Sequence, residues 1–434
     1  MILKNIEQVV GRFSSGSTLR PLYNGYSLVN VPNTVIKILN KNSDAPGPIL
    51  DNAIMKNIET GSIKKVIMIL IDGLGYEMFL DSYRNSEFFS RFVEDGMVTP
   101  LTSGFPSTTT ASITTVNTGL TPQEHALPEW TLYFREIDKI IKPMPMVTID
   151  EKREPLRKII ENPKILYGGD TIYQKMNNAG IASYAIQSSY IAGSTYNKLL
   201  NDGGTIIPYT TNSDMAIKVR KTVQAAKSGY IYGYLDSVDY TTHVYGPKTE
   251  ESSSEITNIG SILQKDLIER TDRATAEETL VMITADHGHA RVDPEKIIYL
   301  EEDKKLAGFY ELGLSGKPIC PSGFLRDVFF HIKENKLEEA KNYLLEKLGG
   351  KAMVLETKKA FEEGMFGIGV PNNKFFDRVG NLIAVPLQDY QIWHSKEWYD
   401  YIRGNKPHMF GMHGGLSKDE ILIPLLTARM SDIM

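Results

Sequence analysis

The chain has almost no cysteine, no long hydrophobic run and no excess of positive charge. Cys320 is the single cysteine among 434 residues, which excludes an internal disulfide framework and a cysteine-rich zinc site. The longest apolar run, residues 66–71, is far too short to cross a bilayer, and the N-terminal segment MILKNIEQVVGRF lacks the apolar region of a secretory signal. The net charge of −5 argues against binding to nucleic-acid duplexes. We therefore expect a cytoplasmic protein without membrane partners, and its oligomeric state stays open.

Short apolar segments that end at polar clusters alternate with helical patterns. The segments that resemble buried strands are 65–71, 181–186, 229–235 and 279–285, and helical periodicity occurs at 214–227 and 253–271. This alternation predicts an α/β fold with a mostly parallel sheet flanked by helices. Ligands bind at the carboxyl ends of strands in such sheets. Asp72, Asp239 and Asp286 follow three of these segments, so we expect them at one edge of the sheet.

The sequence pattern changes before the C-terminal part of the chain. We expect a strand at 325–332, an amphipathic helix at 336–348 and a second strand at 351–356. We therefore predict a catalytic core made of residues 1–299 and 376–434, with a small inserted α+β cap at 300–375. The proline-rich stretch 120–165 is expected to form a long irregular segment over the site.

Histidines and carboxylates occur at spacings that suit metal ions. Asp239 and His243 are four residues apart in DYTTH, so both side chains can reach one ion from one face of a helical turn. Asp286 and His287 end an apolar segment, and His413 lies between glycines in GMHGG. Each of these, taken alone, is also explained by an ordinary surface or structural residue. The remaining histidines are expected to be structural, although His125 is also considered as a support for a ligand residue. His289 is expected to be an ordinary exposed residue, with contact to substrate or to a ligand residue as the alternative.

Residues 107–119 are rich in threonine and read as a loop that enters a helix. Serine and threonine are favoured N-caps, so the cluster is explained by capping alone. The same position also suits catalysis, because a helix N-terminus binds phosphate oxygens and a metal ion can activate a neighbouring hydroxyl as a nucleophile.

These motifs and their order along the chain resemble those of the alkaline phosphatase superfamily. Within it, they resemble the type I phosphodiesterase/nucleotide pyrophosphatase branch. The resemblance covers about residues 65–290 and 380–426. It implies two metal sites and a nucleophile that faces both. The first site would hold Asp239, His243 and His413, and the second would hold Asp72, Asp286 and His287. Counting back nine residues from Thr118 in Thr118–Gly119 makes Thr109 the nucleophile and a ligand of the metals, with Thr108 as the alternative.

The resemblance implies a two-metal hydrolase that cleaves phosphodiester or pyrophosphate bonds, with nucleotide-type substrates, through a covalent phospho-threonine. Zn²⁺ is the preferred metal and Mn²⁺ is the alternative. The main-chain N–H of Thr110 and the hydroxyl of Ser112, which stands where the branch has a phosphate-holding asparagine, are the expected substrate-binding groups. A phosphomonoesterase, phosphonate hydrolase, phosphomutase or non-catalytic binding module stays open. The aromatic residues considered for nucleobase stacking, against ordinary core packing, are Tyr76, Trp130, Tyr133 and Trp393.

Overall fold

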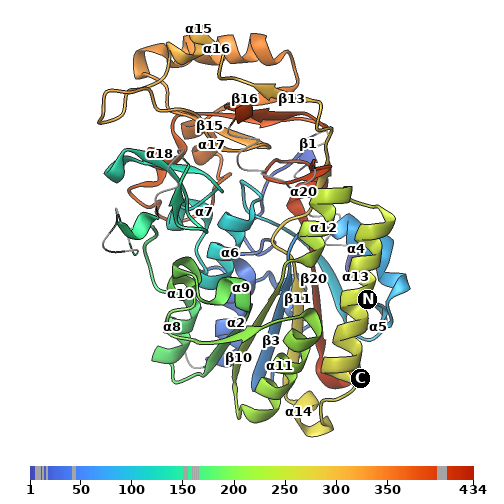
Figure 1. Cartoon of the computed structure of the whole chain (residues 1–434). Coiled ribbons are helices and arrows are strands. Elements are labelled where there is room, and N and C mark those ends of the chain that lie inside the picture. The colour runs from blue at the N-terminus through green and yellow to red at the C-terminus, as the bar shows by residue number, and fades with distance from the viewer. Residues whose placement is uncertain are drawn as a thin grey trace.

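A seven-stranded sheet between two layers of helices forms the core of the protein (Figure 1). The computed structural model describes residues 1–4, 11, 14–15, 18–41, 45–149, 155–158, 160, 162, 164, 166–397 and 408–434. The strands, in spatial order, are β4 (Met97–Thr102), β20 (Leu422–Arg429), β11 (Thr279–Thr284), β3 (Lys65–Ile71), β10 (Gly229–Leu235), β8 (Ser183–Ser188) and β9 (Thr205–Tyr209). Strand β20 is antiparallel to both neighbours, and the remaining pairs are parallel. The predicted mostly parallel sheet is therefore confirmed.

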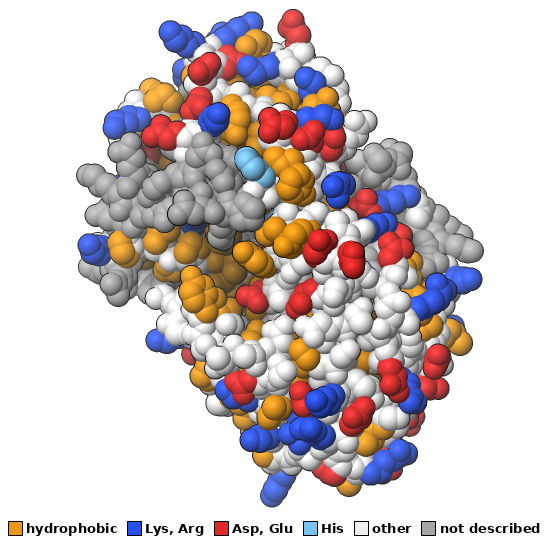
Figure 2. Space-filling view, turned by 45° about the vertical axis from the view of Figure 1, so that its right-hand side comes forward, with side chains coloured by type: hydrophobic (Ala, Val, Ile, Leu, Met, Phe, Trp, Pro, Cys, Tyr) orange, Lys and Arg blue, Asp and Glu red, His pale blue; other side chains and the backbone are white. Residues whose placement is uncertain are grey.

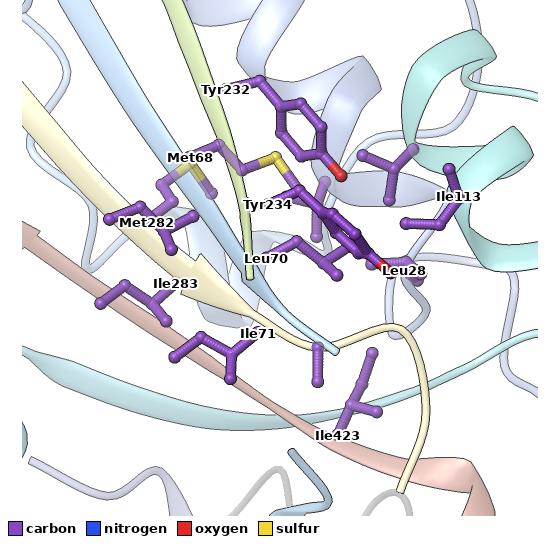
Figure 3. Packing of buried hydrophobic residues seen from close by; sticks show 14 of the residues in the cluster. Leu28, Met68, Leu70, Ile71, Ile113, Tyr232, Tyr234, Met282, Ile283 and Ile423 are labelled. Atoms are coloured by element: carbon purple, nitrogen blue, oxygen red, sulfur yellow. The ribbon is translucent and has the colours of Figure 1, made fainter. Parts of the chain in front are cut away.

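The central strands are apolar throughout because helices cover both faces of the sheet. Every residue of β3, β10 and β11 is buried. Figure 3 shows Met68 and Leu70 of β3 beside Tyr232 and Tyr234 of β10, in the layer that also contains Ile113. The strand expected at 181–186 begins two residues later, at Ser183.

The helices divide between the two faces of the sheet (Figure 1). One layer contains α2 (Asn30–Leu39), α6 (Thr109–Thr118), α8 (Ile172–Asn178) and α10 (Thr195–Leu200). The other contains α4 (Tyr76–Ser82), α5 (Glu87–Glu94), α11 (Asn212–Ala225) and α13 (Glu250–Ile262). The helix expected at 214–227 is α11, and the one expected at 253–271 is α13 followed by a π-helical turn, η5 (Leu263–Ile268).

A second, antiparallel sheet forms a cap at the top of Figure 1, with its own hydrophobic cluster. Its strands, in spatial order, are β14 (Ser322–Phe324), β15 (Asp327–Phe330), β17 (Leu382–Pro386) and β16 (Ala352–Glu356). Helix α16 (Leu337–Leu348) connects β15 to β16, as the strand–helix–strand pattern predicted. Strand β17 lies between them and comes from beyond residue 375, so the predicted boundary of the cap stays a prediction.

The segment expected to be irregular at 120–165 has regular structure in its described part. It contains α7 (Pro122–His125) and a small antiparallel sheet of β5 (Leu132–Phe134), β6 (Lys139–Lys142) and β7 (Val147–Thr148). Residues 150–154 and several of 159–165 lie outside the described residues. In the described chain, no helix combines the length and apolar character needed to cross a membrane.

Candidate active site

The ends of three neighbouring strands place three aspartates at one edge of the sheet. Asp72 directly follows β3, and Asp286 lies two residues beyond β11. Helix α12 (Ser237–Tyr245) begins just after β10 and carries Asp239. Asp72 and Asp286 are buried, and Asp239 is partly exposed. The predicted meeting of these carboxylates is confirmed, because parallel strands end on the same side.

The six residues predicted as metal ligands lie in two groups. Asp239, His243 and His413 form one, and Asp72, Asp286 and His287 form the other; within each group the ligand atoms lie within 4.8 Å of one another. In the first, Asp239 Oδ1 lies 3.4 Å from His243 Nε2 and 3.8 Å from His413 Nε2. In the second, His287 Nε2 lies 3.1 Å from Asp286 Oδ2 and 3.4 Å from Asp72 Oδ1. The groups adjoin, since the rings of His287 and His413 stack with centroids 3.5 Å apart.

The three histidines of these groups share one orientation. In each, Nε2 faces the carboxylates while Nδ1 contacts a main-chain carbonyl oxygen. The Nδ1 atoms of His243, His413 and His287 lie 2.7, 3.1 and 3.1 Å from the carbonyl oxygens of Gly411, Ser107 and Gly288. A proton on Nδ1 leaves the Nε2 lone pair available, as in most metal-binding histidines.

The electrostatics of the groups also suit divalent cations. Burial and the nearby Asp286 and Asp239 carboxylates raise the pKa of Asp72 well above its usual value. Burial alone would raise the pKa of Asp239, but His243 and the other neighbouring histidines hold it well below. Within the described part of the chain, Asp72 Oδ1 and Asp286 Oδ2 are buried without a hydrogen-bond donor. Carboxylates and imidazoles crowded in this way fit divalent metal ions such as Zn²⁺ or Mn²⁺.

The threonines at the start of α6 have different surroundings. The hydroxyl of Thr108 caps the helix by accepting from Ala111 N, and it donates to the carbonyl oxygen of Pro128 at 2.9 Å. The hydroxyl of Thr109 lies 3.1 Å from His287 Nε2 instead. Of these two hydroxyls, that of Thr109 therefore faces the ligand groups.

The two predicted substrate-binding residues are placed differently from each other. Thr110 lines the cavity described below, in the first turn of α6, where main-chain N–H groups lack helical partners. The hydroxyl of Ser112 donates to the carbonyl oxygen of Asp286 at 3.0 Å, and Ser112 is not among the residues that line that cavity. Ser112 thus supports the Asp286 loop, and its contact with substrate stays a prediction.

Helix α6 forms although its sequence, TTASITTVNT, contains many β-branched residues. The hydroxyls of Thr114 and Thr118 donate to the carbonyl oxygens of Thr110 and Thr114, each at 2.7 Å, and so satisfy polar groups in a buried helix. Gly119 ends the helix with φ 72°, a conformation that favours glycine.

His289 contacts a ligand residue, which was the less favoured of the two alternatives considered for it. It was expected to be exposed, but only 1% of its surface is accessible, and its Nε2 lies 3.0 Å from Asp239 Oδ1. The expectation was wrong because β12 (Ala290–Arg291) pairs with β19 (Gly411–Met412) and holds this segment against the site. Gly73, with φ 76°, permits the approach, since a Cβ there would lie 2.7 Å from His289 Nε2. The His-Gly-His sequence was the only local signal.

Tyr234 is a contact that the sequence analysis missed. It belongs to the fully buried strand β10, and its hydroxyl donates to Asp72 Oδ2. Nothing in the apolar pattern of the strand distinguishes it from a core tyrosine. Two histidines expected to be structural are so: His125 contacts the Thr115 hydroxyl at 3.3 Å, and His331 contacts the Asp377 carbonyl oxygen at 2.8 Å.

A cavity of about 280 Å³ opens beside Thr109. Its lining is Thr108, Thr109, Thr110, Glu129, Trp130, Lys142, Asp239, Tyr240, His243, Val244, Phe324, Met409 and His413. Trp130 is the one aromatic residue considered for base stacking that lines it, since Tyr76, Tyr133 and Trp393 are buried elsewhere. Figure 2 shows hydrophobic side chains gathered between the upper and lower parts of the molecule.

Comparison with known protein families shows to which family the chain belongs. Residues 66–416 match the model of the type I phosphodiesterase/nucleotide pyrophosphatase family. The chain belongs to this family. The predicted membership is thereby confirmed, and this metal-dependent family supports phosphoester hydrolysis as the activity. No curated protein is similar enough in sequence to be matched.

Solved structures show the same fold at low sequence identity. Murine ectonucleotide pyrophosphatase/phosphodiesterase 5 is 19% identical, with 83% of this chain and 87% of that chain covered and a TM-score of 0.61. Its inactive threonine-to-alanine variant, in complex with AMP, is 18% identical, with the same coverage and TM-score. Phosphonoacetate hydrolase from Sinorhizobium meliloti 1021, in complex with phosphonoformate, is 16% identical, with 84% and 89% covered and a TM-score of 0.58.

Proposed function

We propose that this family member is a two-metal hydrolase that cleaves phosphodiester or pyrophosphate bonds in nucleotide-type substrates through a covalent phospho-Thr109. The observation that carries the proposal is the position of the Thr109 hydroxyl, 3.1 Å from His287 Nε2 where the two ligand groups adjoin. The inactive variant of the murine relative, which has a threonine replaced by alanine and binds AMP, agrees with a threonine nucleophile.

Asp239, His243 and His413 would hold one metal ion, and the second group would hold the other, with Zn²⁺ preferred and Mn²⁺ as the alternative. Two bound divalent ions supply Lewis acidity, which lowers the pKa of the attacking hydroxyl and neutralises charge at phosphorus. Tyr234 and His289 orient the Asp72 and Asp239 carboxylates through their hydrogen bonds.

The residues of the chain then define two displacements at phosphorus. Thr109 Oγ1 attacks, the bond from phosphorus to the leaving oxygen breaks, and the phosphoryl group is transferred to the threonine. Water displaces Thr109 from phosphorus in the second step, which gives net retention of configuration. The N-terminus of α6, including the main-chain N–H of Thr110, faces the phosphoryl oxygens and stabilises their negative charge.

The other wall of the cavity supports a substrate with a planar apolar group. Trp130 and Phe324 line it together with Met409. Aromatic side chains of this kind stack on nucleobases without regard to sequence. This wall favours a nucleotide over a small aliphatic ester.

The first experiment is a pair of initial rates, on bis-p-nitrophenyl phosphate and on p-nitrophenyl phosphate. The protein is stripped of metal, and Zn²⁺ or Mn²⁺ is then added back. We expect metal-dependent turnover with a clear excess on the diester. A clear excess on the monoester would make the protein a phosphatase, and no turnover on either ester would contradict the proposal.

A phosphonate hydrolase is the second candidate, because the cavity contains a cation. Lys142 lines it, with Nζ 5.8 Å from the centroid of the Trp130 ring, and a substrate that carries a carboxylate beside its phosphonate suits such a charge. Release of inorganic phosphate from phosphonoacetate, faster than from the diester, would establish this activity in place of the first.

A further inference from the structure

An arginine of the cap reaches the core and is not among the described residues that line the cavity. Arg326, in the turn between β14 and β15, is 1% exposed. Its Nε and Nη2 each donate to the carboxylate of Glu420 at 3.0 Å, and Glu420 is fully buried. Glu420 belongs to α20 (Lys418–Ile421), which Figure 1 shows at the end of the core that faces the cap. A buried, paired contact between guanidinium and carboxylate therefore joins the cap to the core.

The remaining nitrogen of Arg326 holds the chain that precedes β18 (Gln391–Trp393). Nη1 donates to the carbonyl oxygens of Gln388 and Tyr390 at 2.9 and 2.6 Å. Gln388 has φ 51°, a left-handed conformation that is uncommon for residues other than glycine. Every guanidinium nitrogen of Arg326 is thus in use. A lysine could not reproduce this set of contacts, because its ammonium group is a single point charge.

Glu420 connects Arg326 to the segment that carries His413. Glu420 Oε1 accepts from Gly415 N at 3.0 Å, and a Cβ at Gly415 would lie 2.8 Å from Glu420 Oε2. The carbonyl oxygen of Gly415 accepts from the Ser107 hydroxyl at 2.9 Å. The carbonyl oxygen of Ser107 in turn lies 3.1 Å from His413 Nδ1. Consecutive contacts therefore run from the cap arginine to the imidazole of His413.

Glu420 also contacts the segment of the second ligand group, but through its main chain. Its carbonyl oxygen accepts from Gly288 N at 2.9 Å. This bond does not involve the carboxylate that Arg326 holds. The first ligand group is linked to the carboxylate itself, through Gly415 and Ser107. The side chain of Arg326 is therefore placed to affect the two ligand groups unequally.

We propose that Arg326 is a positioning residue that orients His413 through its paired contact with Glu420. The cap thereby contributes to tight binding of the metal ion in the first ligand group. This inference rests on the two-metal site of the proposed function. A direct partner of a ligating histidine contributes about 10- to 100-fold to metal affinity. Arg326 acts through further contacts, so we expect the lower end of this range.

Arg326→Met tests this with a metal titration that requires no turnover. Competition with a chromophoric chelator gives the affinities of both Zn²⁺ ions. We expect one ion to bind about tenfold more weakly and the other to change by less than about twofold. In His413→Ala protein, which lacks an imidazole of the first group, Arg326→Met should leave the affinity of the tighter ion unchanged. A tenfold loss for both ions, or for neither, would overturn the proposal.

Two further variants decide the matter even where Arg326→Met does not fold. Arg326→Lys keeps a cation beside Glu420 without the paired donors, so it should still weaken one ion by more than about threefold. Wild-type affinities in Arg326→Lys would contradict the proposal. In Glu420→Gln protein the paired contact is already lost, so adding Arg326→Met should weaken that ion by less than about threefold more. A further tenfold loss would show that Arg326 does not act through Glu420.

Arg378→Met is the matched control. Arg378, in α18 (Phe375–Val379), is also 1% exposed, and its Nη1 donates to the carbonyl oxygens of Ala126 and Leu166, which belong to neither ligand group. Thermal unfolding compares the stability of the two arginine variants. Arg378→Met should lower Tm and leave both metal affinities within about twofold of wild type. If it weakens one ion as much as Arg326→Met does, the effect comes from general stability and the proposal fails.

The visible spectrum of cobalt-loaded protein gives a readout that loss of stability alone does not change, because it reports coordination geometry. The spectrum should change in Arg326→Met and stay as in wild type in Arg378→Met. If wild type binds both ions and cleaves neither ester, the proposed function fails while the titrations still decide the role of Arg326. If wild type cleaves the diester and Arg326→Met binds both ions normally, this inference alone fails. A wild-type protein that binds no metal would overturn both.

Discussion

The two walls of the cavity are built in different ways. The wall with the ligand groups comes from the carboxyl ends of β3 and β11 and from α12, and its side chains are carboxylates and imidazoles. The opposite wall comes mainly from the 120–149 segment and the cap, and it contains Trp130, Phe324 and Glu129. The reactive wall is thus part of the central sheet, whereas the substrate wall is formed by added segments.

This difference indicates which part of the fold carries out the reaction and which part selects the substrate. The sheet holds its strand ends rigidly, because every residue of β3, β10 and β11 is buried. A scaffold of this kind suits ligands that must hold their positions within a fraction of an ångström. Loops and insertions can vary in sequence without disturbing that core. We therefore expect variants of the first wall to stop turnover, and variants of the second to change substrate preference.

Removal of metal should have the largest effect, because it disables the whole reactive wall. Dialysis against a chelator should abolish turnover on both nitrophenyl esters and lower Tm. At a free metal concentration a thousandfold above Kd, bound metal stabilises a folded protein by about 4 kcal/mol. Activity assays and thermal scans before and after return of Zn²⁺ or Mn²⁺ check this. Full activity in protein shown to be metal-free would contradict the two-metal proposal.

Loss of the nucleophile should come next. Thr109→Ala should lower kcat by about 10³-fold or more, with metal content unchanged, since the attacking oxygen is gone. Thr108→Ala is the comparison: it removes the N-cap, at a cost of about 1 kcal/mol in the free energy of unfolding, and should reduce kcat far less. Single-turnover rates and metal analysis decide between them. The reverse order of effects would make Thr108 the nucleophile.

A change behind the reactive wall should have a smaller effect. Tyr234→Phe removes the hydroxyl that donates to Asp72 Oδ2 and should weaken binding of one metal ion by about 10- to 100-fold. Tyr232→Phe is the control, as it removes another buried hydroxyl from β10 and leaves the bond to Asp72 intact. Competition with a chromophoric chelator gives both affinities. Equal metal affinity in Tyr234→Phe and wild type would show that this bond does not position the ligand.

The substrate wall should give the smallest effect on chemistry. Trp130→Ala removes a stacking surface worth about 1–3 kcal/mol for a base, so KM for a nucleotide diester should rise about tenfold with little change in kcat. The KM values of Trp130→Ala and wild type are also compared on bis-p-nitrophenyl phosphate and on a diester without an aromatic group. If kcat falls and KM does not change, Trp130 belongs functionally to the reactive wall.

Much of the reactive wall could be predicted from the sequence because its signals are local. The run at 65–71 ends in Asp72, and the spacing of Asp239 and His243 places both side chains on one helical face. His413 is different: its place in the set came from resemblance to a family, and the fold then brought it within 3.8 Å of Asp239. The choice between Thr108 and Thr109 also required the structure, because adjacent hydroxyls look alike in a sequence.

The sequence by itself determined that strands alternate with helices and that their ends carry carboxylates, because hydrophobic periodicity and short-range spacing are properties of neighbouring residues. Only the tertiary structure decided that His289 turns inward and that Tyr234 contacts Asp72. These contacts join residues far apart in the chain. They depend on how sheets and insertions pack together, and no local pattern of residues encodes that packing.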